Sequence, residues 1–393
     1  MTCLDGRERS NRTEKPLLDN DRVSSMALDE EEQAPSKSDE RIVGLDIARS
    51  LAVFGMVFVN FRVTMGATAV TPVGNALSQV FDGRAAALFV VLAGVGVSLM
   101  SRQGRADGDL RATRSVLLKR SVFLFVVGLL YVPIWPADIL HFYGLYLFAA
   151  AWLLGSSDRT LLGLAAGAVV IACGMLVTLD YEAGWKDWES LEYRDFWTLQ
   201  GFVRNTCFNG FHPVFPWVGF LLLGMWLGRQ RLDDRGTCWR YVAVFGSFAI
   251  GTELGSGALI GNAVASGAFS VEVASSVFGT HSMPPFPLYM IAAASTAAVV
   301  ICVCVRLGVM VRNAAWLQPF VHTGQLALTL YVGHVVVGMG TLEMLGRLGN
   351  QTILAVVVAT TVFCVASVIC SHVWRSRFKR GPLEAVFRMV TGS

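Results

Sequence analysis

Long apolar stretches constrain this sequence more than any other feature. After residue 40, about ten mostly apolar stretches of about 18 to 24 residues follow one another, each long enough to cross a bilayer as a helix. Hydrophobic residues make up 54% of the chain and charged residues only 16%, which leaves too little polar surface for a water-soluble fold. We therefore predict an all-α polytopic membrane protein, a bundle of about ten transmembrane helices.

The apolar pattern divides the chain into a tail and a membrane domain. Residues 1–40 include runs such as DEEEQAPSKSDE, have no apolar period, and are expected to be a disordered cytoplasmic tail. The membrane domain is expected over 41–380, with an N-terminal part at 41–178 and a C-terminal part at 211–390, and a second cytoplasmic tail over 381–393. The expected spans are 42–62, 84–101, 115–135, 137–155, 160–178, 211–229, 239–262, 284–306, 323–344 and 351–374.

The distribution of cationic residues predicts the orientation of these spans. Most of the 32 lysine and arginine residues lie in the two tails and in the loops on the same side as the tails. The opposite side holds only Arg62, Lys186, Arg194, Arg204 and Arg347. Because cytoplasmic loops carry the excess of positive charge, we expect both termini in the cytoplasm of a multi-pass plasma-membrane protein.

Composition argues against several other classes of site. None of the eight cysteines forms a C-x-x-C pair or a Cys/His ligand spacing, so the sequence predicts neither a metal site nor a disulfide framework. The net charge of +3 gives no support for nucleic-acid binding. The expected partner is the lipid bilayer, and the sequence also allows a homodimer.

Two charged residues lie inside the first expected span. A charge at the centre of a span costs about 2.5–3.5 kcal/mol, so such residues usually pair, face a cavity or take part in chemistry. Asp46 and Arg49 are three residues apart and can pair on one helical face, which makes a packed salt bridge one interpretation. Arg49 also shares a face with Asn60, about 16 Å further along the axis, which favours a polar site instead.

Further polar residues lie near the outer ends of other spans. Asp82 and Arg84 start the second span from the outside, and Asp138 lies three residues before His141 at the start of the fourth. A carboxylate beside a histidine can orient the ring, so His141 is the first candidate for a general base. Its alternative interpretation is an interfacial histidine at a helix start.

Three other histidines remain candidates. His212 precedes a proline at the outer start of a span and His281 precedes the proline-rich segment HSMPPFP, so each has a loop or capping role as its alternative. His334 lies near the middle of the ninth span, where it faces either a cavity or a hydrogen-bond partner on another helix.

Several motifs in order resemble one family. LDIARSLAVFGMVFVN resembles the L-D-x-x-R-G-x-A-x-x-G-M-x-x-x-N opening of the transmembrane acyltransferases that include heparan-alpha-glucosaminide N-acetyltransferase and the bacterial YeiB-like membrane proteins. FDGRAAALFVVLAGVGVSLM, DILHFYGLYLF and NGFHPVFPWVGFLLLGMWLGR resemble later spans of these proteins. GQLALTLYVGH and GPLEAVFRMV resemble the C-terminal segment of the YeiB-like group.

The resemblance implies acyl transfer across a membrane. The donor would be cytoplasmic acetyl-CoA or another acyl-CoA, and the acceptor an extracytoplasmic hydroxyl or amine, on a glycan or a lipid-linked sugar. Relatives in the wider superfamily place a cation and a histidine on the first span with ten residues between them. Arg49 stands at the cation position, but Asn60 stands where the histidine would be, and residues 62–82 contain no histidine.

The base is therefore expected from another span. Catalytic candidates are His141, Asp138, His334 and His212, and donor or substrate contacts are expected from Asp46, Arg49, Asn60, Asp82 and Arg84. No metal is expected. The competing hypotheses are a secondary transporter of a small polar solute and a non-catalytic membrane protein. A cavity that contains Arg49 would favour acyl transfer, and a closed interior around Asp46 and Arg49 would argue against it.

Overall fold

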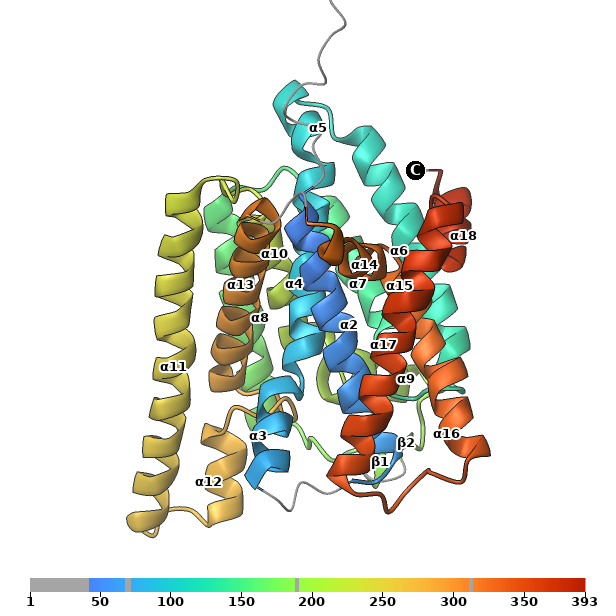
Figure 1. Ribbon diagram of the computed structural model, residues 1–393. Helices are drawn as coiled ribbons and strands as arrows, with labels where there is room; N and C mark the ends of the chain where they lie inside the picture. Colours follow the sequence, from blue (N-terminus) through green and yellow to red (C-terminus); the bar gives the residue numbers. More distant parts are fainter. Residues whose placement is uncertain (1–41, 68–71, 188–190, 311–313, 393) are drawn as a thin grey trace, which may run out of the picture. The chain divides into compact units, whose positions relative to one another are not determined.

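The computed structural model describes residues 42–67, 72–187, 191–310 and 314–392 (Figure 1). The prediction of a disordered tail at 1–40 lies outside these residues. From Ile42 onward the chain forms one compact unit that is almost entirely helical. The expected all-α membrane fold is confirmed, and the described strands are only β1 (Trp185–Asp187) and β2 (Glu192–Tyr193), which pair antiparallel.

The long helices correspond to the apolar stretches of the sequence. They are α2 (Val43–Thr64), α4 (Arg84–Met100), α6 (Arg111–Tyr131), α7 (Leu140–Leu153), α8 (Asp158–Thr178), α10 (Val214–Leu227), α11 (Arg235–Ala265), α13 (Pro287–Met310) and α17 (Ile353–Arg377). The shorter helices are α3 (Pro72–Phe81), α5 (Arg102–Asp107), α9 (Leu199–Arg204), α12 (Val271–Phe278), α14 (Gln318–Gln325), α15 (Ala327–Gly333), α16 (Gly340–Met344) and α18 (Pro382–Thr391).

Irregular turns interrupt two of the spans. The π-helix η1 (Asn205–Asn209) follows α9, and the chain then bends by 50° before α10. A second π-helix, η3 (His334–Met339), joins α15 to α16, and a short 3-10 helix, η2 (Ala315–Leu317), precedes α14. Single π-turns inside helical spans often occur at functional sites, because they redirect the side chains that follow.

Each expected span contains a helix, but not every helix is long and apolar enough to cross a membrane by itself. Seven helical segments of the described chain meet that test, and the bent α9–α10 pair would be an eighth. Helix α7 is apolar but has 14 residues, and the first half of α6 is strongly basic. The number of ten spans therefore stays a prediction.

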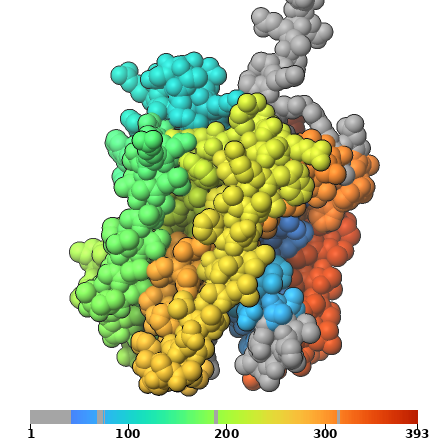
Figure 2. Space-filling model, turned by 90° about the vertical axis from the view of Figure 1, so that its left-hand side faces the viewer, coloured from blue at the N-terminus to red at the C-terminus, as the bar shows by residue number. Residues whose placement is uncertain are grey.

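Helix α2 lies at the centre of the bundle, in contact with α4, α13, α14 and α17 (Figure 1). Its apolar window is 67% buried, whereas that of α11 is only 11% buried, and α11 runs along the face that Figure 2 turns to the viewer. Such an exposed apolar helix is expected to face lipid. The central position of α2 places its polar residues inside the protein.

The two ends of the bundle carry different elements. Helices α5 and α18 lie at one end, which we call the α5 end, and α3, α12 and the β1–β2 hairpin lie at the other, which we call the α3 end (Figure 1). Helix α2 starts toward the α5 end and is followed by α3. The cationic residues predict that the α5 end faces the cytoplasm.

Candidate functional site

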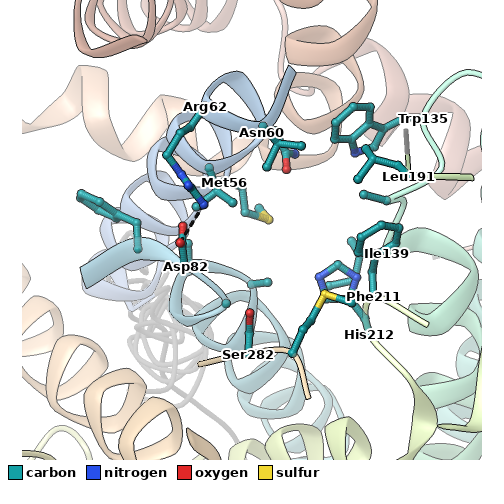
Figure 3. Close-up of a pocket in the computed structure, with 18 of the residues that line it drawn as sticks. Met56, Asn60, Arg62, Asp82, Trp135, Ile139, Leu191, Phe211, His212 and Ser282 are labelled. Carbon is teal, nitrogen blue, oxygen red and sulfur yellow. Dashed lines mark hydrogen bonds and ion pairs between the residues drawn. The ribbon is translucent and has the colours of Figure 1, made fainter. Parts of the chain in front are cut away.

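A cavity of about 200 Å³ lies at the α3 end of the bundle (Figure 3). The last turns of α2, the start of α4, the segment between α6 and α7, the start of α10 and helix α15 all contribute to its wall. Its polar lining residues include Asn60, Arg62, Asp82, His212, Ser282 and Tyr331, and its aromatic lining residues include Trp135, Phe211 and Trp217. Mostly apolar walls with a few convergent polar groups are typical of binding sites for small molecules.

The turn between α3 and α4 brings one wall of the cavity into place. Gly83 has a φ of 70°, a left-handed conformation that favours glycine, and it is the N-cap of α4. A Cβ at this position would collide with Ser282 and lie 2.6 Å from the Tyr289 hydroxyl. The glycine therefore lets the chain turn tightly, with Asp82 on the cavity wall before it.

An ion pair forms the most polar part of the cavity wall. An Arg62 Nη2 atom donates to Asp82 Oδ2 at 2.7 Å, and both side chains keep partial exposure (Figure 3). Asp82 is a predicted contact residue, whereas the sequence indicates Arg62 only as one of the few cationic residues on the outer side. Arg62 lies two residues after Asn60, at the outer end of the first expected span. That position is the signal in the sequence that could have identified it.

Several polar atoms of the lining residues are buried without a hydrogen-bond partner among the described residues. They are Arg62 Nε, Asp82 Oδ1, Trp135 Nε1, His212 Nδ1 and Trp217 Nε1. Most buried polar atoms in proteins are hydrogen-bonded, because leaving one unpaired costs about 1–3 kcal/mol. A concentration of such atoms around one cavity indicates that water or a polar ligand satisfies them.

His212 lies in the break between the two halves of the bent span and lines the cavity. Its backbone carbonyl accepts a hydrogen bond from the Tyr146 hydroxyl at 2.5 Å, and the Trp217 ring packs edge-on with its centroid 4.6 Å from the histidine centroid. These contacts hold the ring while Nδ1 keeps no partner among the described residues. Of the predicted catalytic histidines, His212 is the one that reaches the cavity directly.

The Asn60 amide contacts an imidazole from the C-terminal part of the chain. Asn60 Nδ2 lies 2.9 Å from Nε2 of His334, which is the first residue of η3 and is 1% exposed. With the amide nitrogen as donor, Nε2 of His334 accepts the bond and its lone pair is occupied. His334 therefore positions Asn60 in the cavity wall instead of entering the cavity itself.

Asp138 and His141 form the predicted pair, but behind the cavity wall. Asp138 Oδ2 lies 3.1 Å from His141 Nδ1, and Oδ1 accepts a hydrogen bond from the Tyr331 hydroxyl at 3.1 Å. The same hydroxyl accepts a bond from the backbone N–H of Ile139. Tyr331 lines the cavity and His141 does not, so the tyrosine separates this pair from the cavity.

Two other residues near this end have partners away from the cavity. Arg84 forms an ion pair with Glu253 of α11, and its guanidinium also donates to the Thr280 hydroxyl at 3.3 Å. This contact links α4 to α11, and the predicted substrate contact of Arg84 stays a prediction. His281 is exposed and adjoins Ser282, which lines the cavity.

The Asp46–Arg49 pair exists at the opposite end of α2 and lies outside the cavity. Arg49 Nη1 donates to Asp46 Oδ1 at 2.5 Å; the Asp46 side chain is 1% exposed and that of Arg49 28%. Ser50 donates to the carbonyl oxygen of Phe320, which ties this turn of α2 to α14. The cavity includes Asn60 but does not extend to Arg49, so it is not the Arg49-lined cavity that would favour acyl transfer.

The described residues contain no group of three or more histidine, cysteine, aspartate or glutamate side chains placed to hold a metal ion.

Tyr331 is the functional candidate in the C-terminal part that the sequence analysis does not predict. It lies in the quoted segment GQLALTLYVGH, three residues before His334, so its signal was its place in that motif.

Two family models match consecutive parts of the chain. Residues 41–249, more than half of the sequence, match the family described as heparan-alpha-glucosaminide N-acetyltransferase, catalytic. Residues 249–393 match a family described as a protein of unknown function (DUF418). No curated protein matches the sequence. The first match carries most of the polar cavity residues, and the second carries Ser282, Tyr331 and His334.

Proposed function

Since the chain belongs to the heparan-alpha-glucosaminide N-acetyltransferase catalytic family, we propose that it is a membrane acyltransferase whose acceptor binds in the cavity at the α3 end. The donor would be acetyl-CoA or another acyl-CoA from the α5 end. The acceptor would present a hydroxyl or amine, on a glycan or a lipid-linked sugar.

One observation carries the proposal. The cavity brings a histidine, an amide and an ion pair together at the far end of the span with the acyltransferase-like opening motif, and its lining residues hold unpartnered polar atoms. A sugar-like acceptor offers hydroxyl groups that can satisfy such atoms, and aromatic walls such as Trp135 suit the apolar faces of a sugar ring.

In the proposed reaction the acceptor oxygen or nitrogen attacks the thioester carbonyl of the donor. His212 accepts the proton that the acceptor loses, the bond between carbonyl carbon and sulfur breaks, and the proton is then returned to the departing CoA thiolate. Asn60, oriented by His334, and the Arg62–Asp82 pair would hold the acceptor in line for attack.

Arg49 is proposed as the donor-side cation. Its guanidinium keeps 28% exposure while Asp46 neutralises part of its charge, so it could approach a CoA phosphate at the α5 end. Since the cavity does not extend to Arg49, the proposal requires that the pantetheine arm of the donor part the side chains between Arg49 and Asn60 when the donor binds.

Inverted membrane vesicles test the proposed activity. Radiolabelled acetyl-CoA is added to sealed vesicles with and without the protein, and label is sought in luminal glycan and lipid. We expect transfer that depends on the protein and is lost in the His212→Asn variant. Absence of transfer to any acceptor from acyl-CoA donors of several chain lengths would contradict the proposal.

A secondary transporter is the second candidate, because one of the spans is broken. The α9–η1 segment and α10 meet at a 50° bend with His212 in the break, and interrupted helices form the substrate sites of many transporters. Uptake of small polar solutes into proteoliposomes, together with no acyl transfer, would favour this function over the first.

A further inference from the structure

Helix α18, in the segment expected to be a C-terminal tail, packs on the bundle at the α5 end. Its Glu384 carboxylate accepts a bond from the backbone N–H of Thr329 at 3.0 Å and another from the Thr329 hydroxyl at 2.5 Å. The backbone N–H of Leu383 donates to the same hydroxyl at 3.1 Å. The first turn of α18 is therefore held against α15.

Only part of the apolar face of α18 is covered by protein. The Phe387 ring packs against Phe123 of α6, with 5.3 Å between the ring centroids. The neighbouring apolar residues of the same helix remain uncovered: Met389 is 81% exposed, Val390 58% and Val386 45%. A helix with this pattern at the end of a membrane bundle is suited to lie in the interface between hydrocarbon and headgroups.

The segment that contains α18 and the turn before it is rich in cationic residues. From Arg375 onward, with Arg375 included, the chain carries five arginine and lysine residues and one acidic side chain, Glu384, which is already bonded to Thr329. The turn before α18 is held by the Trp374 indole N–H, which donates to the Arg380 carbonyl at 2.8 Å. Lys379 and Arg380 are both exposed on this turn.

We propose that α18 and the turn before it form a binding surface for anionic lipid headgroups. The uncovered residues Val386, Met389 and Val390 would enter the headgroup region, and Lys379 and Arg380 would contact lipid phosphates. The charge bias of the sequence predicts that this end faces the cytoplasmic leaflet, which is the anionic one, and attraction to such a leaflet contributes about fivefold in binding per cation near the surface.

The same surface is connected to the cavity through α15. Thr329, which Glu384 holds, lies two residues before Tyr331 of the cavity wall and five before His334. Lipid that fixes α18 would therefore also fix the start of the helix that supplies this wall. The lipid-binding surface itself does not depend on which reaction the cavity performs.

Hydrogen exchange of the full-length protein in lipid nanodiscs tests the proposal. The discs contain phosphatidylcholine alone or phosphatidylcholine mixed with phosphatidylglycerol. We expect the backbone amides of α18 to exchange about five- to twentyfold more slowly in the anionic discs, and high salt to reduce the difference. The K379Q/R380Q variant should lose most of this protection.

A matched control removes two exposed cations elsewhere at the same end. The R102Q/R111Q variant changes the net charge equally, so it should keep the protection if the surface around α18 binds the lipid. Equal exchange rates in the two kinds of disc, or equal losses in the two variants, would overturn the proposal. Protection that depends on protein concentration instead of lipid charge would indicate a second copy of the chain and would also overturn it.

Discussion

Helix α2 carries two sets of polar residues, Asp46 with Arg49 toward one end and Asn60 with Arg62 toward the other. The first set is packed against other helices, and the second lines a cavity. Toward the α5 end, Asp46 pairs with Arg49 and is closed in by α14. Toward the α3 end, Asn60 and Arg62 line a cavity, with partners from η3 and from the turn between α3 and α4. In the sequence both sets are simply polar residues within one apolar stretch.

The two groups differ in the packing around them more than in their chemistry. Gly324 of α14 lies so close to α2 that a Cβ on it would collide with the Asp46 carbonyl oxygen. At the other end, the last turns of α2, the turn at Gly83 and the break before α10 enclose the cavity. We therefore interpret Asp46 as a structural residue and the cavity as the site.

The largest expected effect is on the rate of acyl transfer, when His212 in the cavity wall is replaced. We expect His212→Asn to lower the rate of acyl transfer by about 10²–10⁴-fold, because the asparagine cannot accept the acceptor's proton. Initial rates with labelled acetyl-CoA measure it, with His281→Asn as the control variant, since His281 is exposed outside the cavity lining. Equal rates for both variants would remove His212 from the mechanism.

The next largest effect is on stability, where α14 packs against α2 beside Asp46. We expect Gly324→Ala to destabilise the protein by about 3 kcal/mol, because the new methyl group must push α14 away from the Asp46 backbone. Gly333→Ala is the matched control, since a Cβ at Gly333 meets no atom within 4 Å. Thermal unfolding in detergent compares the two. If Gly324→Ala is no less stable than Gly333→Ala, α14 does not close this end.

A smaller effect is expected for the Arg84–Glu253 ion pair, which lies at the α3 end but outside the cavity. Glu253→Gln removes the partner of Arg84 outside the cavity, where the Glu253 side chain is 42% exposed. We expect a loss of about 1 kcal/mol in stability, as for other partly exposed ion pairs, and an unchanged transfer rate. A large fall in rate at unchanged stability would extend the site to Arg84.

The positions of the helices could be predicted from the sequence, because the length and hydropathy of each apolar stretch determine them locally. Ion pairs within one element could be predicted as well. Asp138 beside His141, and Asp46 beside Arg49, follow from a spacing of three residues within one element. These pairs form as the sequence predicts, although neither His141 nor Arg49 lines the cavity.

Contacts between distant elements could not be predicted in the same way. The partners of Asn60 and Arg84 are His334 and Glu253, which lie far along the chain, and only the packing of helices brings them together. The interruption of the span before α10, which carries His212 to the cavity, likewise depends on the π-turn η1 and the bend after it.

The smallest expected effect concerns pH at the packed end. Burial, with the neighbouring charges of His372 and Arg375, lowers the pKa of His322, whose Nδ1 lies 3.2 Å from Nδ1 of His372. Since the unfolded chain binds the proton at the higher pKa, near 6.5, stability is lost as pH falls below about 6.5. We expect the melting temperature to drop by about 1–2 °C and His322→Asn to flatten this dependence. A melting temperature that rises on acidification would show that the histidine pair is stabilised by protonation.

The most direct test compares the two polar groups of α2 in one assay. Transfer of labelled acetyl groups is measured at saturating donor for Arg62→Gln and Asp46→Asn, with rates expressed per amount of folded protein. If the cavity is the site, Arg62→Gln lowers the rate by about tenfold or more, since it removes a charge-assisted contact to the acceptor, while Asp46→Asn retains most of it. The reverse order, with Asp46→Asn inactive and Arg62→Gln unimpaired, would place the chemistry at the packed end and contradict the assignment of the cavity.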